Sequence, residues 1–209
     1  MEEKKLTEKE SLELITDMIS RTKERYHLGD GNIMLMWGYL TVSVTALVWI
    51  LLALTRNPAC NWLWFLIWII GGIATPLMAK NKRKEYGFKS YSDRISSRIW
   101  SIVGFSAIAS TLFCLGFLYI AHADSWGMMF SFALIIVPMA EICQGLVINE
   151  KSFVWGGCGG LLVGIFTACC IAARIPLGAN WYLPLFMASF ASMLIVPGHI
   201  LNHTARRTK

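Results

Sequence analysis

Six apolar stretches, each long enough to cross a bilayer, occupy most of the 209 residues of this chain. A hydrocarbon core about 30 Å thick is spanned by roughly 20 helical residues. Hydrophobic residues make up 56% of the chain and charged residues only 15%, as in multi-span membrane proteins. The sequence therefore predicts an all-α, polytopic membrane protein with six transmembrane helices. The predicted spans are 32–54, 61–79, 98–121, 125–148, 153–173 and 181–201.

The six stretches fall into three similar pairs. In each pair, the first stretch begins with a tryptophan near one membrane face. The second begins with a tryptophan near the other face and carries a proline late in its span. The first tryptophan and the proline are separated by 39, 38 and 42 residues, which predicts a two-helix hairpin repeated three times. The residues are Trp37, Trp62 and Pro76; Trp100, Trp126 and Pro138; Trp155, Trp181 and Pro197.

Lysine and arginine are distributed unevenly between the two sides of the predicted membrane. Of the 19 basic residues, 17 lie in the N-terminal segment, in the second and fourth loops, or in the tail 202–209. Only Arg56 and Arg174 lie on the opposite side. Positive residues in short loops stay cytoplasmic, so we expect both termini in the cytoplasm. Residues 1–31 hold no apolar signal-peptide region, so the first span is expected to remain as an anchor.

Residues 1–31 are predicted to form a cytosolic amphipathic helix and a linker. Thr7 and Glu10 fit a capping box, and Gly29-Asp30-Gly31 predicts the end of the helix before the first span. The segment carries a net charge of −2, which favours contact with protein over contact with anionic lipid. We expect residues 7–27 to pack on this chain itself, on a protein partner or on a second copy. The apolar face of this helix contains Leu12, Ile15 and Ile19.

The loop 80–98 between the second and third spans is strongly basic. Four of its cations follow the second span at once, where each gains about 1 kcal/mol near an anionic leaflet. We therefore expect contact with membrane lipid, and no nucleic acid as a partner, because no aromatic or glycine pattern accompanies the charges. Ser90-Tyr91-Ser92-Asp93 resembles a helix start, so the third helix is expected to begin before it enters the membrane. The four cations are Lys80, Lys82, Arg83 and Lys84.

Small residues recur every fourth position along the fifth span. Between helices in lipid there is no hydrophobic driving force, so close backbone approach over small residues stabilises their association. We expect this stripe to be buried against another helix, more readily one of the same chain than one of a second copy. The stripe consists of Gly156, Gly160, Gly164, Ala168 and Ala172.

The tryptophans lie mostly at the ends of the predicted spans. Indole rings prefer the headgroup layer, so these residues are interpreted as an aromatic belt. The repeated Trp37, Trp100 and Trp155 also allow an aromatic cage for a quaternary ammonium ligand. Their position at interface depth favours the belt.

Glu141 is an acidic residue inside the fourth span, eight residues before Asn149. An ionised carboxylate there costs several kcal/mol unless it is paired or hydrated. Gln144 follows one turn later, and His199 and Asn202 lie at a similar depth in the sixth span. One interpretation is a buried hydrogen bond from Glu141 to His199 or Gln144 that joins two helices, and this is the one we expect. The other is a proton- or cation-coupled substrate site; intramembrane hydrolysis has least support, since no H-E-x-x-H motif or serine accompanies the acid.

Neither cysteine nor histidine spacing indicates a metal site. Five of the six cysteines lie inside predicted spans, and no C-x-x-C motif occurs. We expect no metal and no cofactor.

Two motifs carry a resemblance to a known group of proteins. Gly31-Asn32-Ile33-Met34-Leu35-Met36-Trp37-Gly38-Tyr39 follows the charged N-terminal helix, and Lys89-Ser90-Tyr91-Ser92-Asp93-Arg94 precedes Trp100. The chain resembles, over nearly its whole length, small uncharacterised six-span proteins of bacterial inner membranes. The resemblance implies this location and no activity.

Two classes of function follow from these patterns. The first is a non-enzymatic membrane protein, a scaffold or sensor that acts through helix packing and its N-terminal helix. The second is a small transporter or channel subunit with Glu141 as the coupling residue. Carriers usually bring several polar groups together at mid-membrane, and here only one acid is buried, which favours the first class.

Overall fold

The computed structural model describes residues 7–27, 31–86, 91–122 and 125–207, which are helical apart from short connections and contain no strand. Six helical segments within them are long and apolar enough to cross a membrane, which confirms the predicted helical membrane fold. They are Gly31–Thr55, Pro58–Asn81, Arg94–Ile120, Trp126–Ile148, Lys151–Ala172 and Ala179–Thr204. The elements are α1 (Glu8–His27), α2 (Gly31–Thr55), η1 (Pro58–Trp64), α3 (Phe65–Tyr86), α4 (Tyr91–Ile120), α5 (Trp126–Ile148), α6 (Lys151–Ala172), α7 (Ala179–Phe190), η2 (Ala191–Ile195) and α8 (Val196–Arg207).

Local signals explain where several helices begin and end. Asn57 accepts a hydrogen bond from the Ala59 backbone N–H (2.9 Å) and Pro58 follows it, so the 3₁₀ segment η1 starts there. Asn149 adopts the left-handed conformation (φ 57°) that ends α5 and turns the chain into α6.

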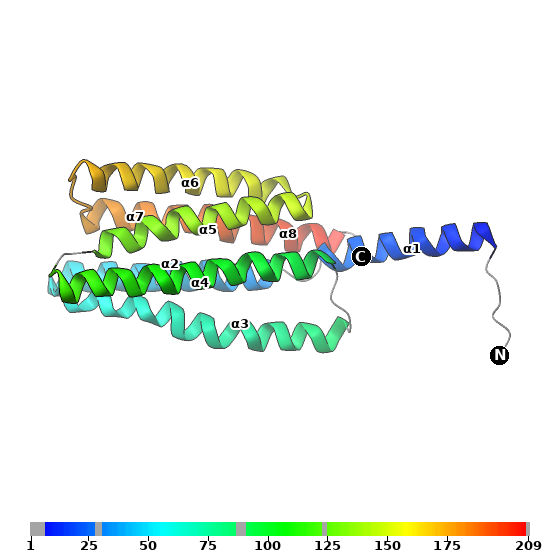
Figure 1. The fold of residues 1–209 in the computed structure, drawn as a ribbon, viewed down its shortest axis with the longest axis horizontal. Coiled ribbons are helices and arrows are strands. Elements are labelled where there is room, and N and C mark those ends of the chain that lie inside the picture. Colours follow the sequence, from blue (N-terminus) through cyan, green and yellow to red (C-terminus); the bar gives the residue numbers. More distant parts are fainter. Residues whose placement is uncertain (1–6, 28–30, 87–90, 123–124, 208–209) are drawn as a thin grey trace.

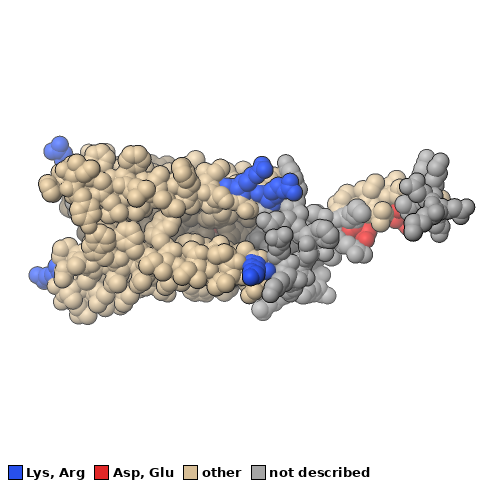
Figure 2. Space-filling model, turned by 60° about the horizontal axis from the view of Figure 1, so that its bottom comes forward, with Lys and Arg blue, Asp and Glu red and all other residues tan. Residues whose placement is uncertain are grey.

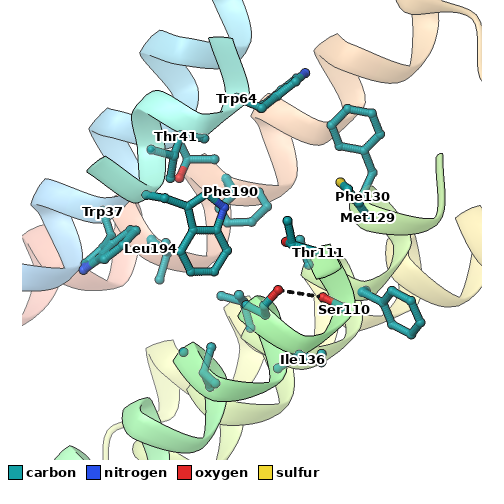
Figure 3. Close-up of a pocket in the computed structure, with 18 of the residues that line it drawn as sticks. Trp37, Thr41, Trp64, Ser110, Thr111, Met129, Phe130, Ile136, Phe190 and Leu194 are labelled. Carbon is teal, nitrogen blue, oxygen red and sulfur yellow. Dashed lines mark hydrogen bonds between the residues drawn. The ribbon is translucent and has the colours of Figure 1, made fainter. Parts of the chain in front are cut away.

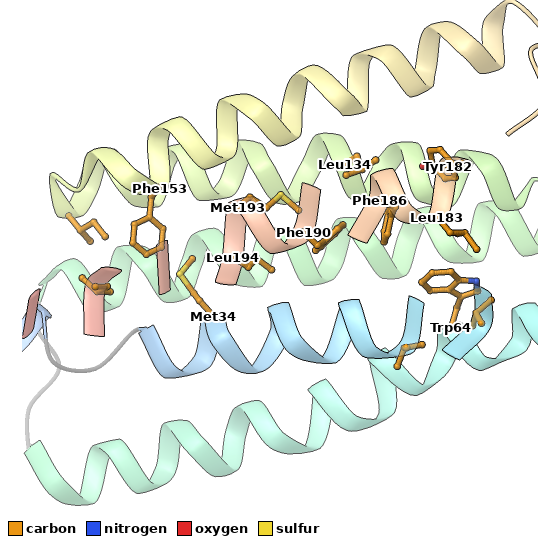
Figure 4. Packing of buried hydrophobic residues seen from close by; sticks show 14 residues of the cluster. Met34, Trp64, Leu134, Phe153, Tyr182, Leu183, Phe186, Phe190, Met193 and Leu194 are labelled. Atoms are coloured by element: carbon orange, nitrogen blue, oxygen red, sulfur yellow. The ribbon is translucent and has the colours of Figure 1, made fainter. Parts of the chain in front are cut away.

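The sixth span occupies the centre of the bundle (Figure 1). α7, η2 and α8 pack against α2 on one side, and η2 and α8 pack against α6 on the other. Half of the buried side chains drawn in Figure 4 come from this span, because it is surrounded by other helices. They include Tyr182, Leu183, Phe186, Phe190, Met193 and Leu194.

α3 and α4 lie at the periphery. α3 packs on α2 and η1, and α4 packs on α5. In the most apolar window of each helix only 11% of the residues are buried, against 44% for α5. The bundle thus has two lobes, one with α2 and α3 and one with α4, α5 and α6.

The glycines of α6 lie against two neighbours rather than one. A Cβ on Gly156 would lie 3.0 Å from the Ser192 carbonyl oxygen, whereas one on Gly164 would meet the Leu134 carbonyl of α5. Gly160 lies between Met193 and Pro138, and its burial confirms the expected packing within the chain. The prediction is wrong for the last two residues of the stripe, because Ala168 is only half-buried and Ala172 is exposed. A spacing of four residues drifts about 40° per step around a helix, so the buried face continues through Thr167 and Cys170 instead.

α1 extends away from the bundle (Figure 1). Its predicted capping box is confirmed, with the Thr7 N–H donating to Glu10 Oε2 (2.8 Å) and the Glu10 N–H to Thr7 Oγ1 (3.4 Å). The apolar side chains Leu12, Ile15 and Ile19 are exposed by 67%, 56% and 62%, so this face does not pack on the described part of the chain.

Several helices extend beyond the predicted membrane spans. The region 80–98 is not a single loop, because α3 continues to Tyr86 and α4 begins at Tyr91, next to the predicted helix start. The side chains of Lys82, Arg83 and Lys84 lie outside the described part, as do Lys89 and Ser90. The predicted tail 202–209 is helical as far as Arg207.

Candidate functional site

A groove separates the two lobes of the bundle (Figure 2). It contains a cavity of about 320 Å³, at the lower end of the range for small-molecule sites. α2, η1 and α3 form one wall, α4 and α5 form the other, and residues of α7 and η2 lie between them. The cavity is thus built by five of the six candidate spans, and only α6 contributes nothing to its lining among the described residues.

The lining is apolar and rich in aromatic rings. Trp64 and Phe130 lie on opposite walls at one end, with ring centroids 4.9 Å apart (Figure 3). The only polar side chains that line the cavity, apart from the indole N–H groups, are hydroxyls of threonine and serine. Five tryptophans take part: Trp37, Trp64, Trp68, Trp100 and Trp126.

Two of these tryptophans are held by hydrogen bonds to a neighbouring helix. The Trp37 Nε1–H of α2 donates to Thr75 Oγ1 of α3 (3.0 Å), and the Trp100 Nε1–H of α4 donates to Gln144 Oε1 of α5 (3.2 Å). Each bond joins the two helices of one hairpin and holds an indole ring in the cavity wall. Trp155, at the corresponding position of the third hairpin, is 75% exposed, so the similarity of the pairs does not extend to it.

Trp64 differs from these two residues. Its side chain is 9% exposed and its Nε1–H has no hydrogen-bond acceptor. A buried donor without a partner is costly.

The aromatic residues are therefore divided between two roles. Trp62, Trp155 and Trp181 are exposed, as expected for a belt. Of the five cavity tryptophans, three belong to the wall of α2, η1 and α3 and two to the wall of α4 and α5, a grouping that sequence position alone did not reveal. Trp155 is exposed and does not line the cavity, so Trp37, Trp100 and Trp155 do not form the cage that was the less favoured alternative to the belt.

Basic residues lie at both ends of the bundle, and three of those at one end belong to helices that border the groove. Lys80 on α3, and Arg94 and Arg98 on α4, are exposed. Figure 2 shows basic side chains on both lobes at this end. Lys80 follows the cavity-lining Thr75 by five residues, and Arg98 precedes the cavity-lining Trp100 by two.

Glu141 is fully buried inside α5, and neither of its carboxylate oxygens has a hydrogen-bond partner. One turn earlier, Pro138 packs on Gly160 of α6, as does Met193 of the π-helical segment η2. Gln144 is also buried, with the bond from Trp100 described above.

The expected hydrogen bond between Glu141 and His199 is absent. His199 is exposed, and its Nε2 lies 2.7 Å from the Tyr39 hydroxyl. Asn202 donates from Nδ2 to Asn32 Oδ1 of α2 (2.9 Å). The prediction was wrong because similar depth in two helices says nothing about which faces meet: His199 and Asn202 bond to α2. The four residues do not form one site.

The described residues contain no group of three or more His, Cys, Asp or Glu side chains that could hold a metal ion. Comparison with known protein families, with curated proteins and with solved structures finds no match for this chain.

Proposed function

We propose that this protein is a non-enzymatic integral membrane protein, a sensor or scaffold whose membrane domain binds an apolar ligand in the groove between the lobes. The supporting observation is the aromatic cavity of about 320 Å³ bounded by the two least buried spans. Its few hydroxyls provide neither a nucleophile with a base nor an acid pair, so the lining is suited to binding rather than to chemistry. By its sequence resemblance and charge distribution, we place the protein in a bacterial inner membrane with both termini in the cytoplasm.

Such a sensor would pass its signal on through α1. Its exposed apolar face at Leu12, Ile15 and Ile19 offers a surface for a protein partner or a second copy. If a second copy binds there, the full-length protein is a dimer in gentle detergent and Leu12→Ser/Ile15→Ser is a monomer. Equal masses for the two proteins would exclude self-association through α1.

The test of the groove is a filling substitution. A Cβ on Gly104 of α4 meets nothing within 4 Å, and Gly104 lines the cavity, so Gly104→Leu extends into the groove without disturbing the backbone. Gly116 of the same helix is equally unobstructed and does not line the cavity, which makes Gly116→Leu the matched control.

The probe is a neutral detergent with a brominated alkyl chain, because bromine quenches nearby indole fluorescence. We expect Gly104→Leu to lose part of the quenching seen in the wild type and Gly116→Leu to retain it. Equal quenching in all three proteins would show that the groove does not hold an apolar chain.

A second candidate function is a small transporter or channel subunit in which Glu141 couples protons or cations. It is favoured by the buried carboxyl without a hydrogen-bond partner. In proteoliposomes with an imposed potential, this function predicts ion uptake that Glu141→Gln abolishes while the thermal stability is retained. Absence of uptake by the wild type, with Glu141→Gln equally stable, would leave only the sensor.

A further inference from the structure

We propose that the ligand of the groove is one acyl chain of an anionic glycerophospholipid, whose phosphate is bound by Lys80, Arg94 and Arg98 at the basic end. This inference rests on the proposed function of the groove as an apolar binding site. It adds the identity of the occupant and the residues that select it.

The depth of the groove fits a chain from one leaflet. On α4 the lining runs from Trp100 to Thr111. Eleven residues at 1.5 Å rise correspond to about 16 Å. Half of a hydrocarbon core about 30 Å thick is about 15 Å, the distance an acyl chain covers from its headgroup to the bilayer midplane.

The charges fit the headgroup of the same lipid. Three exposed cations, carried by α3 and α4, the two peripheral helices that border the groove, lie within a few residues of the lining in sequence, at the end where α3 leaves the groove and α4 enters it. The stretches 65–81 of α3 and 94–120 of α4 contain no aspartate or glutamate. Arginine binds phosphate oxygens through two N–H groups at once, and lysine supplies a point charge. At the opposite end of the chain's spans the only basic residues are Arg56 and Arg174.

The experiment is native mass spectrometry of the full-length protein in mixed micelles. The probes are phosphatidylglycerol and phosphatidylethanolamine with identical acyl chains, so that only the headgroup charge differs. The wild type should retain one phosphatidylglycerol per chain, at least tenfold in preference to phosphatidylethanolamine. Lys80→Gln/Arg94→Gln/Arg98→Gln should abolish the preference, since each cation near an anionic headgroup contributes roughly fivefold in affinity.

The matched control is Arg56→Gln/Arg174→Gln, which removes cations at the other end and should leave the preference intact. All of these positions are exposed, so the variants are expected to fold, and their melting temperatures check this.

The outcomes separate this inference from the function on which it rests. Equal retention of the two lipids by the wild type, or an unchanged preference in the triple variant, would overturn the anionic lipid while the groove remained a site. Unchanged retention of lipid by Gly104→Leu would instead refute the groove itself. A dimer mass with no bound lipid, lost in Gly104→Leu but not in Gly116→Leu, would show that a second copy occupies the groove.

Discussion

The pairs α5–α6 and α3–α4 have almost the same mean hydropathy and very different burial. The mean hydropathy of the most apolar window is 1.9 for α5 and 2.0 for α4, yet 44% of the residues in the first window are buried and 11% in the second. Gly157, Gly160 and Gly164 bring the backbones of α5 and α6 into contact. A Cβ on either of the α4 glycines Gly104 and Gly116 would meet nothing within 4 Å. In a bilayer, therefore, steric fit and not hydropathy decides which helices form a scaffold and which are left to bind something else.

The largest difference in stability between the two regions should appear when a large side chain is removed from each. Phe153 of α6 is fully buried, whereas Phe113 of α4 is 70% exposed. We expect Phe153→Ala to lower the free energy of unfolding by about 3 kcal/mol because it leaves a cavity, and Phe113→Ala to change it little. Denaturant titration of both variants in the same detergent measures this. Equal losses would mean that α4 is packed as tightly as α6.

A large side chain should destabilise the protein at one glycine of α6 and be tolerated at another. In Gly164→Leu the new side chain meets the Leu134 backbone, whereas Gly159 faces open space. We expect Gly164→Leu to cost about 1–3 kcal/mol and Gly159→Leu to be tolerated. Thermal unfolding followed by tryptophan fluorescence provides the comparison; an unchanged melting temperature for Gly164→Leu would place this face of α6 in lipid.

The fold was largely predictable from the sequence, and the candidate site was not. Span length, the Thr7–Glu10 cap and the helix start at 90–93 are local features, so the sequence specifies them directly. The groove depends on which helices do not touch, and Trp37, Trp64 and Trp100 lie far apart in the chain. The predicted pairing of Glu141 with His199 failed for a similar reason, because equal depth did not determine the relative rotation of their helices.

Loss of the hydrogen bond between α2 and α3 should lower the stability of the protein only slightly. Thr75→Val keeps the shape of the side chain and removes the acceptor of the Trp37 N–H. Polar contacts between membrane helices average about 0.6 kcal/mol, and we expect a loss of that order. The control is Thr45→Val, because the Thr45 hydroxyl donates only within its own helix, to the Thr41 carbonyl. Equal losses in the two variants would show that the bond between the helices contributes nothing.

The smallest expected effect is on the stability of α1, which lies outside the membrane domain. Hydrogen bonds from the backbone N–H and the hydroxyl of Thr7 lower the pKa of Glu10 below its ordinary value of 4.5. A lowered pKa in the folded helix means that the cap stabilises α1 above pH 4.5 and is lost as the pH falls through the lowered pKa. Amide hydrogen exchange in the first turn should therefore accelerate at low pH, beyond the intrinsic trend. Glu10→Gln, whose side-chain amide does not titrate, should remove that dependence; a wild type that behaves like Glu10→Gln would contradict the cap.

The most direct test of the contrast between the two regions is a pair of distance distributions from spin labels in a cysteine-free background. One pair sits at Ile73 and Ile108, exposed on α3 and α4, and the other at Met139 and Leu162, exposed on α5 and α6. We predict a narrow distribution for Met139–Leu162 in every condition. We predict a broad one for Ile73–Ile108 in neutral detergent, which narrows when phosphatidylglycerol is added. Two equally narrow distributions, neither changed by the lipid, would contradict the account of a rigid scaffold beside an open, ligand-filled groove.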